Sequence, residues 1–353
     1  MTEQHKKIVS AVIQKAEALC PDSLELIGVY GSCATGDTHE KSDLDLMILI
    51  NDEAGRCLAE GFILEDVGIG YDLYCTTWDM LEGDAECEHP YLGKLMDSVV
   101  LWVKEPAATQ RLEALRRRAT ETLLSDGRFG KAAMAYERAK GAFAECFLTD
   151  SLPSVRMGAA EVIYQGLNAL MLSRGRYFRR GVKRTFEEVS EVAPSWDARA
   201  DTLAVMEAED VDSLRGALTL WMRQVRAHMA VPLPVGKAEP CRENLAGTYE
   251  EMVSNWQNKM GEAAERGDLF SSFMNLASLQ LMLDDIAAEV DITERDAMAG
   301  FDPRDLGQNA QVFDNVLEAY LEEYRRAGME PRRFADVDGF LADYLGGISS
   351  EPQ

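Results

Sequence analysis

Residues 28–50 read GVYGSCATGDTHEKSDLDLMILI, and this stretch decides the fold of the N-terminal part of the chain. Gly31 and Ser32 sit in a turn after a short apolar run, and Asp43 and Asp45 come where a second apolar run begins. Residues two apart in a strand project from the same face, so these two carboxylates are expected to point the same way. Two like charges aimed at one spot repel unless a cation lies between them, and the turn offers backbone N–H groups and a hydroxyl to a phosphate. The stretch therefore predicts a site for a divalent metal ion and a phosphate.

The charge of the chain limits its partners. In 353 residues, 36 Lys and Arg oppose 61 Asp and Glu, which gives a formal net charge of −25. Such an acidic surface argues against binding of DNA or RNA, so template-directed polymerisation is a poor explanation. An acidic cleft would attract cations, metal ions or a polyamine, and the plainer alternative is that the acid excess keeps the protein soluble.

Cysteine usage and the lengths of the apolar runs indicate a cytoplasmic protein. The seven cysteines are scattered and never form a C-x-x-C pair, which favours reduced thiols over disulfides or a zinc site. The N-terminus lacks a secretory apolar region, and no apolar run approaches the ~18 residues of a membrane span. We therefore expect a soluble cytoplasmic chain that has no membrane partner.

The apolar pattern predicts an α+β fold, in which a small N-terminal mixed sheet with helices is followed by a large all-α helical region. In the first part we expect helices at 4–19 and 53–60 and strands at 24–30, 44–50, 69–75 and 98–103. In the second part we expect helices at 108–124, 129–149, 154–174, 184–193, 211–229, 243–266, 269–289, 307–327 and 333–345. The helix at 269–289 is expected to have an apolar face made by Phe270, Phe273, Met274, Ala277 and Leu281. Because the prolines of VPLPVGK (231–237) mark a linker, the expected domains are 1–105, 106–232 and 233–353.

Asp72 is a third carboxylate, in the strand expected at 69–75. Together with Asp43 and Asp45 it suits a two-ion site, in which ions about 3.5–4 Å apart stabilise the attacking and leaving oxygens of a displacement at phosphorus. A D-x-D pair by itself is weak evidence, since aspartates often cap strand ends. An unpaired carboxylate inside a buried strand is costly, however, and the neighbouring Gly-Ser turn strengthens the functional interpretation.

These residues resemble the polymerase-β-type nucleotidyltransferase superfamily. The matching signature is GSCATG, then a spacer, then SDLDL. The resemblance implies a minimal catalytic unit made of a strand, a Gly-Ser turn, a helix and a D-x-D strand. In that unit Asp43, Asp45 and Asp72 would hold Mg²⁺, and Gly31 and Ser32 would contact the phosphates of ATP.

Other positions bear on this resemblance, which covers residues 20–105. Ser42 is a further candidate for cofactor binding, whereas Cys33 stands where the family often has a basic residue, which weakens the case for an extra phosphate contact. The helical remainder is similar in layout to bacterial nucleotidyltransferases that modify aminoglycoside or lincosamide antibiotics. The implied reaction is transfer of AMP from ATP to a hydroxyl of a small, cationic, aminoglycoside-like acceptor, with release of pyrophosphate. This would be an antibiotic-resistance activity.

The attacking hydroxyl must lose its proton, so a carboxylate general base is expected near the metal. The candidates are Asp72, Glu145 as the named choice on the helix at 129–149, and also Glu82, Glu86, Glu88 and Glu137. The alternative for each glutamate is a solvated helix face.

Basic residues that would neutralise the triphosphate occur in two groups. They are Lys131, Arg138 and Lys140, and the denser cluster Arg174, Arg176, Arg179, Arg180, Lys183 and Arg184. The alternatives for the dense cluster are a solvated charge run and a docking site for a negatively charged neighbour. His39 and His89 are expected at the surface.

Two other functions stay open. Nucleotide transfer to a protein hydroxyl, as in family members that silence a partner toxin, would use the same carboxylates. A non-catalytic nucleotide-binding module would keep the fold without the chemistry. A homodimer formed through an apolar helical face is a further expectation.

Overall fold

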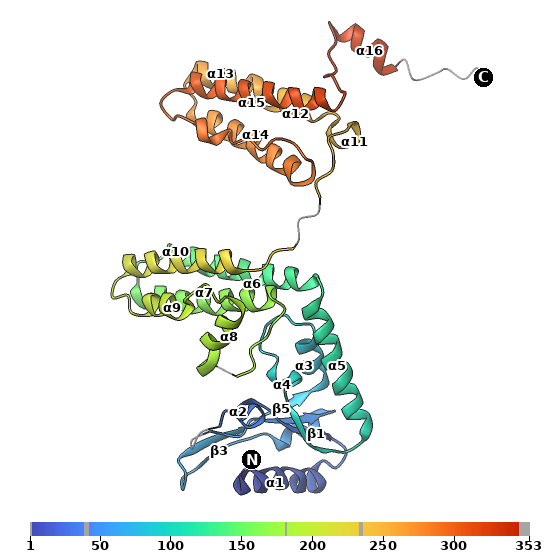
Figure 1. The fold of residues 1–353 in the computed structure, drawn as a ribbon, viewed down its shortest axis with the longest axis vertical. Coiled ribbons are helices and arrows are strands. Elements are labelled where there is room, and N and C mark those ends of the chain that lie inside the picture. The colour runs from blue at the N-terminus through green and yellow to red at the C-terminus, as the bar shows by residue number, and fades with distance from the viewer. Residues whose placement is uncertain (1, 39–41, 181, 233–235, 346–353) are drawn as a thin grey trace, which may run out of the picture. The chain divides into compact units, whose positions relative to one another are not determined.

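A computed structural model describes residues 2–38, 42–180, 182–232 and 236–345, so the predicted surface position of His39 lies outside the described residues. Contacts between Cα atoms divide the chain into two units, Met1–Leu233 and Pro234–Gln353. The first unit holds the sheet and the helices that follow it, and the second is helical (Figure 1). Within the described ranges, no helix is long and apolar enough to cross a membrane.

A four-stranded mixed sheet forms the centre of the first unit, with strand order β5-β2-β1-β6. Its strands are β1 (Leu24–Val29), β2 (Leu46–Ile50), β5 (Cys75–Thr77) and β6 (Val99–Val103). β1 is antiparallel to both β2 and β6, while β2 and β5 are parallel. The predicted fold class, a small mixed sheet followed by a large helical region, is therefore confirmed.

The central strands β1 and β2 are buried on both faces, as the continuous apolar run in β2 predicts, whereas the edge strand β6 is partly exposed. Helix α1 (Glu3–Leu19) covers one face, where Ile48 joins its core. The other face is covered by α3 (Trp78–Ala85), α4 (Gly93–Met96) and α5 (Pro106–Leu124). Met47 and Leu49 point to that second face, and both are fully buried. Figure 1 shows the sheet between these two layers of helices.

Three details of this part differ from the prediction. The helix expected at 53–60 is the 3₁₀ helix η1 (Glu53–Leu58), and the unpredicted strand β3 (Glu60–Leu64) follows it. β3 pairs with β4 (Ile69–Leu73) in a separate hairpin, so the strand expected at 69–75 is two elements in two sheets. The sequence pattern does not predict β3, because its side chains are half-buried or exposed and do not alternate between apolar and polar.

The remaining helices of the first unit form a bundle with its own core. The bundle contains α6 (Gly127–Glu145), α7 (Leu152–Ser173), η2 (Val182–Arg184), α8 (Thr185–Val192), α9 (Ala198–Met206) and α10 (Val211–His228). The short helix α2 (Gly31–Thr35) is not part of it, and its Cys33 packs against the core on the α1 side of the sheet. α9 was not expected from the sequence. Its buried positions are Ala198, Thr202 and Val205, which are too small or too polar to give a clear apolar period.

The second unit is also helical, but not as predicted throughout. Its elements are α11 (Arg242–Leu245), α12 (Thr248–Met252), the π-helical η3 (Val253–Gln257), α13 (Asn258–Arg266), α14 (Leu269–Glu289), η4 (Met298–Gly300), α15 (Leu306–Arg326) and α16 (Val337–Leu345). The single helix expected at 243–266 is broken because Gly247 adopts φ +88° before α12. The apolar face expected on α14 is not the face that packs in the core. Leu276, Leu279 and Leu283 enter the core, whereas Phe270 and Leu281 are exposed.

Candidate active site

Gly31 and Asp45 meet at the edge of the sheet where β1 ends and β2 begins. The N–H of Tyr30 donates to the carbonyl oxygen of Asp45 at 3.0 Å, which continues the pairing of β1 with β2. Gly31 starts α2 with φ +61°, and a Cβ there would lie 2.0 Å from Oδ2 of Asp45. A side chain at this position would therefore be strained by the backbone and would also collide with the carboxylate. Glycine in the turn leaves the room that the Asp45 carboxylate occupies.

Asp43 and Asp45 influence each other electrostatically. Burial raises the pKa of the Asp45 carboxyl to about 6, and the negative charge of Asp43 contributes to that rise. Asp43 itself is exposed, in the segment just before β2, so the strand begins two residues later than predicted. The carboxylates predicted to share one face thus lie close enough for their charges to oppose each other.

The pKa of Tyr30 is affected by two further carboxylates, Asp72 and Asp84. Burial raises the pKa of its phenol to about 12, with smaller contributions from the negative charges of Asp45, Asp72, Asp43 and Asp84. Asp72 belongs to the β3–β4 hairpin rather than to the main sheet, and its side chain is exposed. Asp84 is on α3 and was not singled out from the sequence, because nothing in its local pattern marks it. The negative charges of four carboxylates therefore act on the Tyr30 phenol at the end of β1.

Across the described segments, no group of three or more His, Cys, Asp or Glu side chains is arranged to hold a metal ion. Asp43 and Asp45, which the sequence predicts as metal ligands, therefore do not belong to a larger cluster of this kind among the described residues. Asp72 lies within electrostatic reach of the same Tyr30 phenol.

A cleft of about 460 Å³ opens beside the Asp45 carboxylate. It is lined by Tyr30, Gly31, Asp45, Asp84, His89, Tyr91, Gly93, Lys94, Phe178 and Arg179. These residues come from the junction of β1 and α2, from the residue before β2, from α3 and α4 with the segment between them, and from the segment after α7. The cleft therefore joins the acidic end of the sheet to positive and aromatic side chains from the helical part of the same unit.

The polar groups of the cleft are partly paired. The Asp84 carboxylate lies at ion-pair distance from two side chains, with His89 Nε2 at 3.6 Å from Oδ1 and Lys94 Nζ at 3.7 Å from Oδ2. Among the described residues, no donor hydrogen-bonds to Oδ2 of Asp84. Arg179 donates through Nε to Oδ1 of Asp97 at 3.2 Å, and Tyr177 donates to the same oxygen at 3.1 Å. His89, expected only as a surface residue, is thus half-exposed in the wall of the cleft.

Aromatic side chains stiffen one wall of this cleft. The ring of Tyr91 stacks on Tyr164 with centroids 5.4 Å apart and on Phe178 with centroids 5.3 Å apart. The N–H of Phe178 donates to the carbonyl of Pro90 at 2.7 Å. The segment after α7 is therefore fixed against the segment between α3 and α4, which holds Arg179 at the cleft.

A bidentate ion pair connects the Gly-Ser turn to the helical bundle. Arg184 donates through Nε to Oδ2 of Asp37 at 3.0 Å and through Nη2 to Oδ1 at 2.9 Å. The hydrogen bond from Arg184 holds the pKa of the Asp37 carboxyl below its usual range. Asp37 follows the end of α2, and its N–H donates to the carbonyl of Ser32 at 3.1 Å. The turn is thus anchored at its far end by a residue 147 positions later in the chain.

Most of the dense basic cluster is used in ion pairs inside the protein. Arg176 pairs with Glu191 at 3.0 Å, and Arg180 pairs with Glu187 at 3.5 Å. Arg174 donates to the carbonyl of His228 at 2.6 Å. Within the cluster, Arg179 is the member that lines the cleft.

The other predicted site residues lie in different surroundings. Ser32 is the second residue of α2, next to Gly31, and Ser42 directly precedes Asp43. Glu145 is exposed at the C-terminal end of α6, next to Cys146 in the core of the helical bundle. Of the basic residues predicted on α6, Lys131 pairs with Glu88, Lys140 pairs with Glu137, and Arg138 is exposed.

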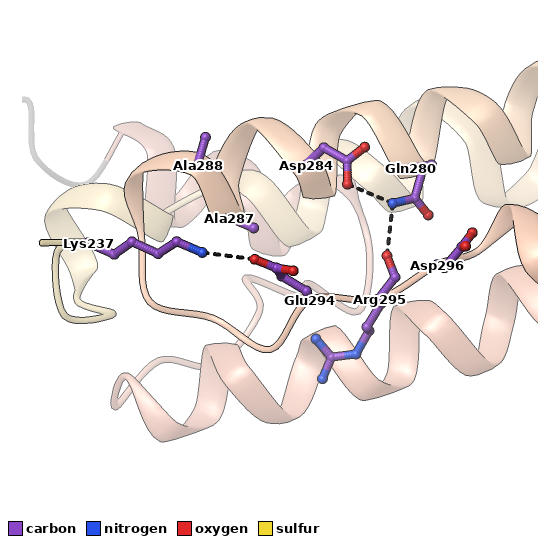
Figure 2. A pocket seen from close by; sticks show the side chains of 8 residues that line it. All are labelled: Lys237, Gln280, Asp284, Ala287, Ala288, Glu294, Arg295 and Asp296. Atoms are coloured by element: carbon purple, nitrogen blue, oxygen red, sulfur yellow. Dashed lines mark hydrogen bonds and ion pairs between the residues drawn. The ribbon is translucent and has the colours of Figure 1, made fainter. Parts of the chain in front are cut away.

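A second cavity, of about 550 Å³, lies in the unit Pro234–Gln353. It is lined by Lys237, Gln280, Asp284, Ala287, Ala288, Glu294, Arg295 and Asp296. Its polar groups bond mainly to one another, as Figure 2 shows for Lys237 with Glu294 at 3.1 Å and for Gln280 with Asp284 at 2.7 Å. It lacks the Gly-Ser turn and the D-x-D pair, so we place the candidate active site at the first cleft.

Comparison with known proteins is consistent with this location. Residues 8–91 match a family model described as a nucleotidyltransferase domain. This matched range contains the turn, the D-x-D pair, Asp72, Asp84 and His89. A search of curated proteins finds no match.

One solved structure with a similar outline is a nucleotidyltransferase-like protein from Exiguobacterium sibiricum 255-15. It is 11% identical in sequence, with a TM-score of 0.39, and the alignment covers 80% of this chain and 90% of that chain. The superfamily resemblance noted in the sequence is confirmed by the family match. Over residues 8–91, this chain matches the nucleotidyltransferase domain of the polymerase-β-like superfamily.

Proposed function

We propose that this chain transfers AMP from ATP to a hydroxyl group of a small acceptor and releases pyrophosphate. The observation that carries the proposal is the Asp45 carboxylate, which packs on the side-chain-free Gly31 and faces a cleft that also holds Lys94 and Arg179. A carboxylate beside a phosphate-binding turn, with cations across the cleft, is the charge arrangement that a nucleoside triphosphate with a divalent metal requires.

Asp43 and Asp45 are the residues that would hold Mg²⁺. They fit the ion because burial and a like charge together raise the pKa of Asp45, and a cation between the two carboxylates would remove this repulsion. Mg²⁺ is commonly held by one or two carboxylates together with substrate phosphates, and Asp72 is the proposed third carboxylate for a second ion. When bound, the metal would neutralise charge on the phosphates and help orient the attacking and leaving oxygens.

The phosphates would lie between the turn and the cations of the cleft. Gly31 and Ser32 would approach them from the turn, with Ser42 nearby. Lys94 and Arg179 would approach from the opposite wall, where Lys94 is mostly buried and Arg179 is half-exposed. These two cations give the triphosphate a defined direction relative to Asp45.

Asp84 is the proposed general base for the acceptor hydroxyl. It lines the same cleft as Asp45, and its Oδ2 has no hydrogen-bond donor among the described residues. The acceptor proton would pass to this carboxylate while the hydroxyl oxygen attacks the α-phosphate. Asp84 lines the cleft, whereas Glu145, the general base named from the sequence, does not, so Asp84 is the better placed of the two.

A cationic acceptor, such as an aminoglycoside, suits the charge of the protein. The formal net charge of −25 raises the local concentration of polycations, and the carboxylates of Asp45 and Asp84 line the cleft. The acceptor would enter the cleft from the side of Asp84, away from the turn that holds the phosphates.

A pyrophosphate-release assay with an acceptor panel tests the proposal. Purified protein would be incubated with ATP and Mg²⁺, alone and with aminoglycosides, lincosamides and neutral sugars. Release that depends on one acceptor class and is lost in Asp45→Asn supports the proposal. If no acceptor raises pyrophosphate release, and Asp45→Asn leaves ATP and Mg²⁺ binding unchanged, the proposal fails. A modified protein instead of a modified small molecule would indicate a protein acceptor.

A further inference from the structure

Two free thiols lie side by side at the edge of the catalytic domain, on the α1 side of the sheet. The Sγ atoms of Cys20 and Cys57 are 3.6 Å apart, although the residues are 37 positions apart in the chain. Cys20 caps the C-terminal end of α1, and Cys57 lies in η1, which leads from β2 to the β3–β4 hairpin. The contact therefore joins the end of a helix to a segment that enters the hairpin of Asp72.

The two thiols differ in exposure. Cys20 is buried, with 5% of its surface exposed, whereas Cys57 is exposed to solvent. Burial and then the contact with Cys57 raise the pKa of the Cys20 thiol to about 11. A dissolved oxidant therefore reacts with Cys57 first, and the buried Cys20 is the second sulfur to react.

Other cysteines provide a comparison. Cys75 is buried, and its Sγ donates to the carbonyl of Gly55 at 3.5 Å. Cys33 has its nearest polar neighbours in the His5 ring and the carbonyl of Asp43, at 3.9 and 3.8 Å. Among the described contacts, neither Cys75 nor Cys33 has another sulfur atom as close as the 3.6 Å that separates Cys20 and Cys57.

We propose that Cys20 and Cys57 form an oxidant-sensitive modification site that reacts with hydrogen peroxide to give an intramolecular disulfide. The Cys57 thiolate attacks peroxide, the O–O bond breaks, and Cys57 becomes a sulfenic acid while hydroxide leaves. The Cys20 sulfur then attacks the Cys57 sulfur, forms the S–S bond and displaces water. Overall, two thiols and one peroxide give one disulfide and two waters.

The two sulfur atoms need to move only a short distance to form a disulfide. A disulfide has its sulfurs about 2.05 Å apart, so the two atoms must approach by about 1.5 Å from the observed 3.6 Å. The exposed Cys57 side chain is the one free to turn. The bond would close the chain between α1 and η1, and this restricts the unfolded state more than the native state.

Peptide mapping without reduction tests the proposal on the full chain. The reduced protein would be treated with one equivalent of peroxide, its remaining thiols alkylated, and the product cut with trypsin and a glutamate-specific protease. Cleavage after Glu17 and Glu25 leaves Cys20 in the fragment 18–25, and cleavage after Arg56 and Glu60 leaves Cys57 in the fragment 57–60. These fragments carry no other cysteine.

The expected product is fragment 18–25 linked to fragment 57–60, which dithiothreitol separates. Cys57→Ser should abolish the link, whereas the matched variant Cys33→Ser should keep it. The unfolding temperature of the oxidised wild-type protein should rise by about 5 °C, with no rise in Cys57→Ser. Irreversible oxidation of Cys57 without a link, or a link from Cys57 to Cys75, would overturn the proposal.

Discussion

Gly31→Ala tests the close contact on which the candidate site depends. The added Cβ would lie 2.0 Å from Oδ2 and 2.9 Å from Cγ of Asp45, far inside van der Waals contact. The positive φ of +61° costs a non-glycine residue about 1–2 kcal/mol, and the Asp45 carboxylate must also swing away. Since a displacement of about 1 Å in a reacting group is enough to reduce rates about 100-fold, we expect at least that loss in kcat/KM.

Gly36→Ala is the matched control. Gly36 ends the same short helix with φ +78°, but a Cβ there would meet nothing within 4 Å. It carries the backbone strain without the collision, so both variants should lose about 1–2 kcal/mol in the free energy of unfolding, measured with urea. Pyrophosphate release should persist in Gly36→Ala and fall in Gly31→Ala. Equal activity in the two variants would refute the claim that room for the Asp45 carboxylate is what this glycine provides.

Three further perturbations follow from the same geometry. Asp45 has a folded-state pKa of about 6, above its unfolded value of about 3.9, so ionisation of this carboxyl lowers the free energy of unfolding. This loss of stability is absent below about pH 4 and complete above about pH 6. This pKa shift corresponds to about 3 kcal/mol before screening, and the partial exposure of Asp45 reduces the cost to about 1 kcal/mol. Asp45→Asn should therefore stabilise the metal-free protein against urea at about pH 7.5 and lose this advantage at about pH 4.5. An unchanged urea midpoint at the higher pH would count against this prediction. Arg184→Ala should raise the KM for ATP more than it lowers kcat. The exchanged pair, Asp37→Arg with Arg184→Asp, should restore part of the affinity for ATP. Steady-state kinetics that show no change in KM would contradict the role of Arg184 in positioning the Gly-Ser turn. Lys94→Ala should raise the KM for ATP about tenfold, whereas the matched surface variant Lys140→Ala should not, and equal KM values would remove Lys94 from the phosphate site.

The sequence was informative where the site is local in the chain. Gly31, Asp43 and Asp45 follow one another within a single β–turn–β segment, so spacing and alternation suffice to place them together. Asp84, Lys94 and Arg179 come from three separate segments, and each sits in a pattern typical of a solvated helix or charge run. Their convergence depends on the packing of the segment after α7 against α4, which no short-range pattern records.

The helical part shows the same limit for packing. Helix α14 is apolar nearly all round, so periodicity marks a helix without deciding which side is buried. Phe270 belongs to the apolar face expected from the sequence and is 74% exposed, while Leu276 and Leu279 are completely buried. The choice of face is made by the helices packed against α14, above all α13 and α15, and therefore by tertiary structure.

The fate of two labels in ATP tests the central claim most directly. ATP labelled at the α-phosphate and ATP labelled at the γ-phosphate would be compared in parallel with Mg²⁺ and the acceptor found in the panel. Nucleotidyl transfer predicts that the α label moves to the acceptor and that the γ label leaves as pyrophosphate, with both events lost in Asp45→Asn. Appearance of the γ label on the acceptor, or transfer of the α label at an undiminished rate by Asp45→Asn, would contradict it.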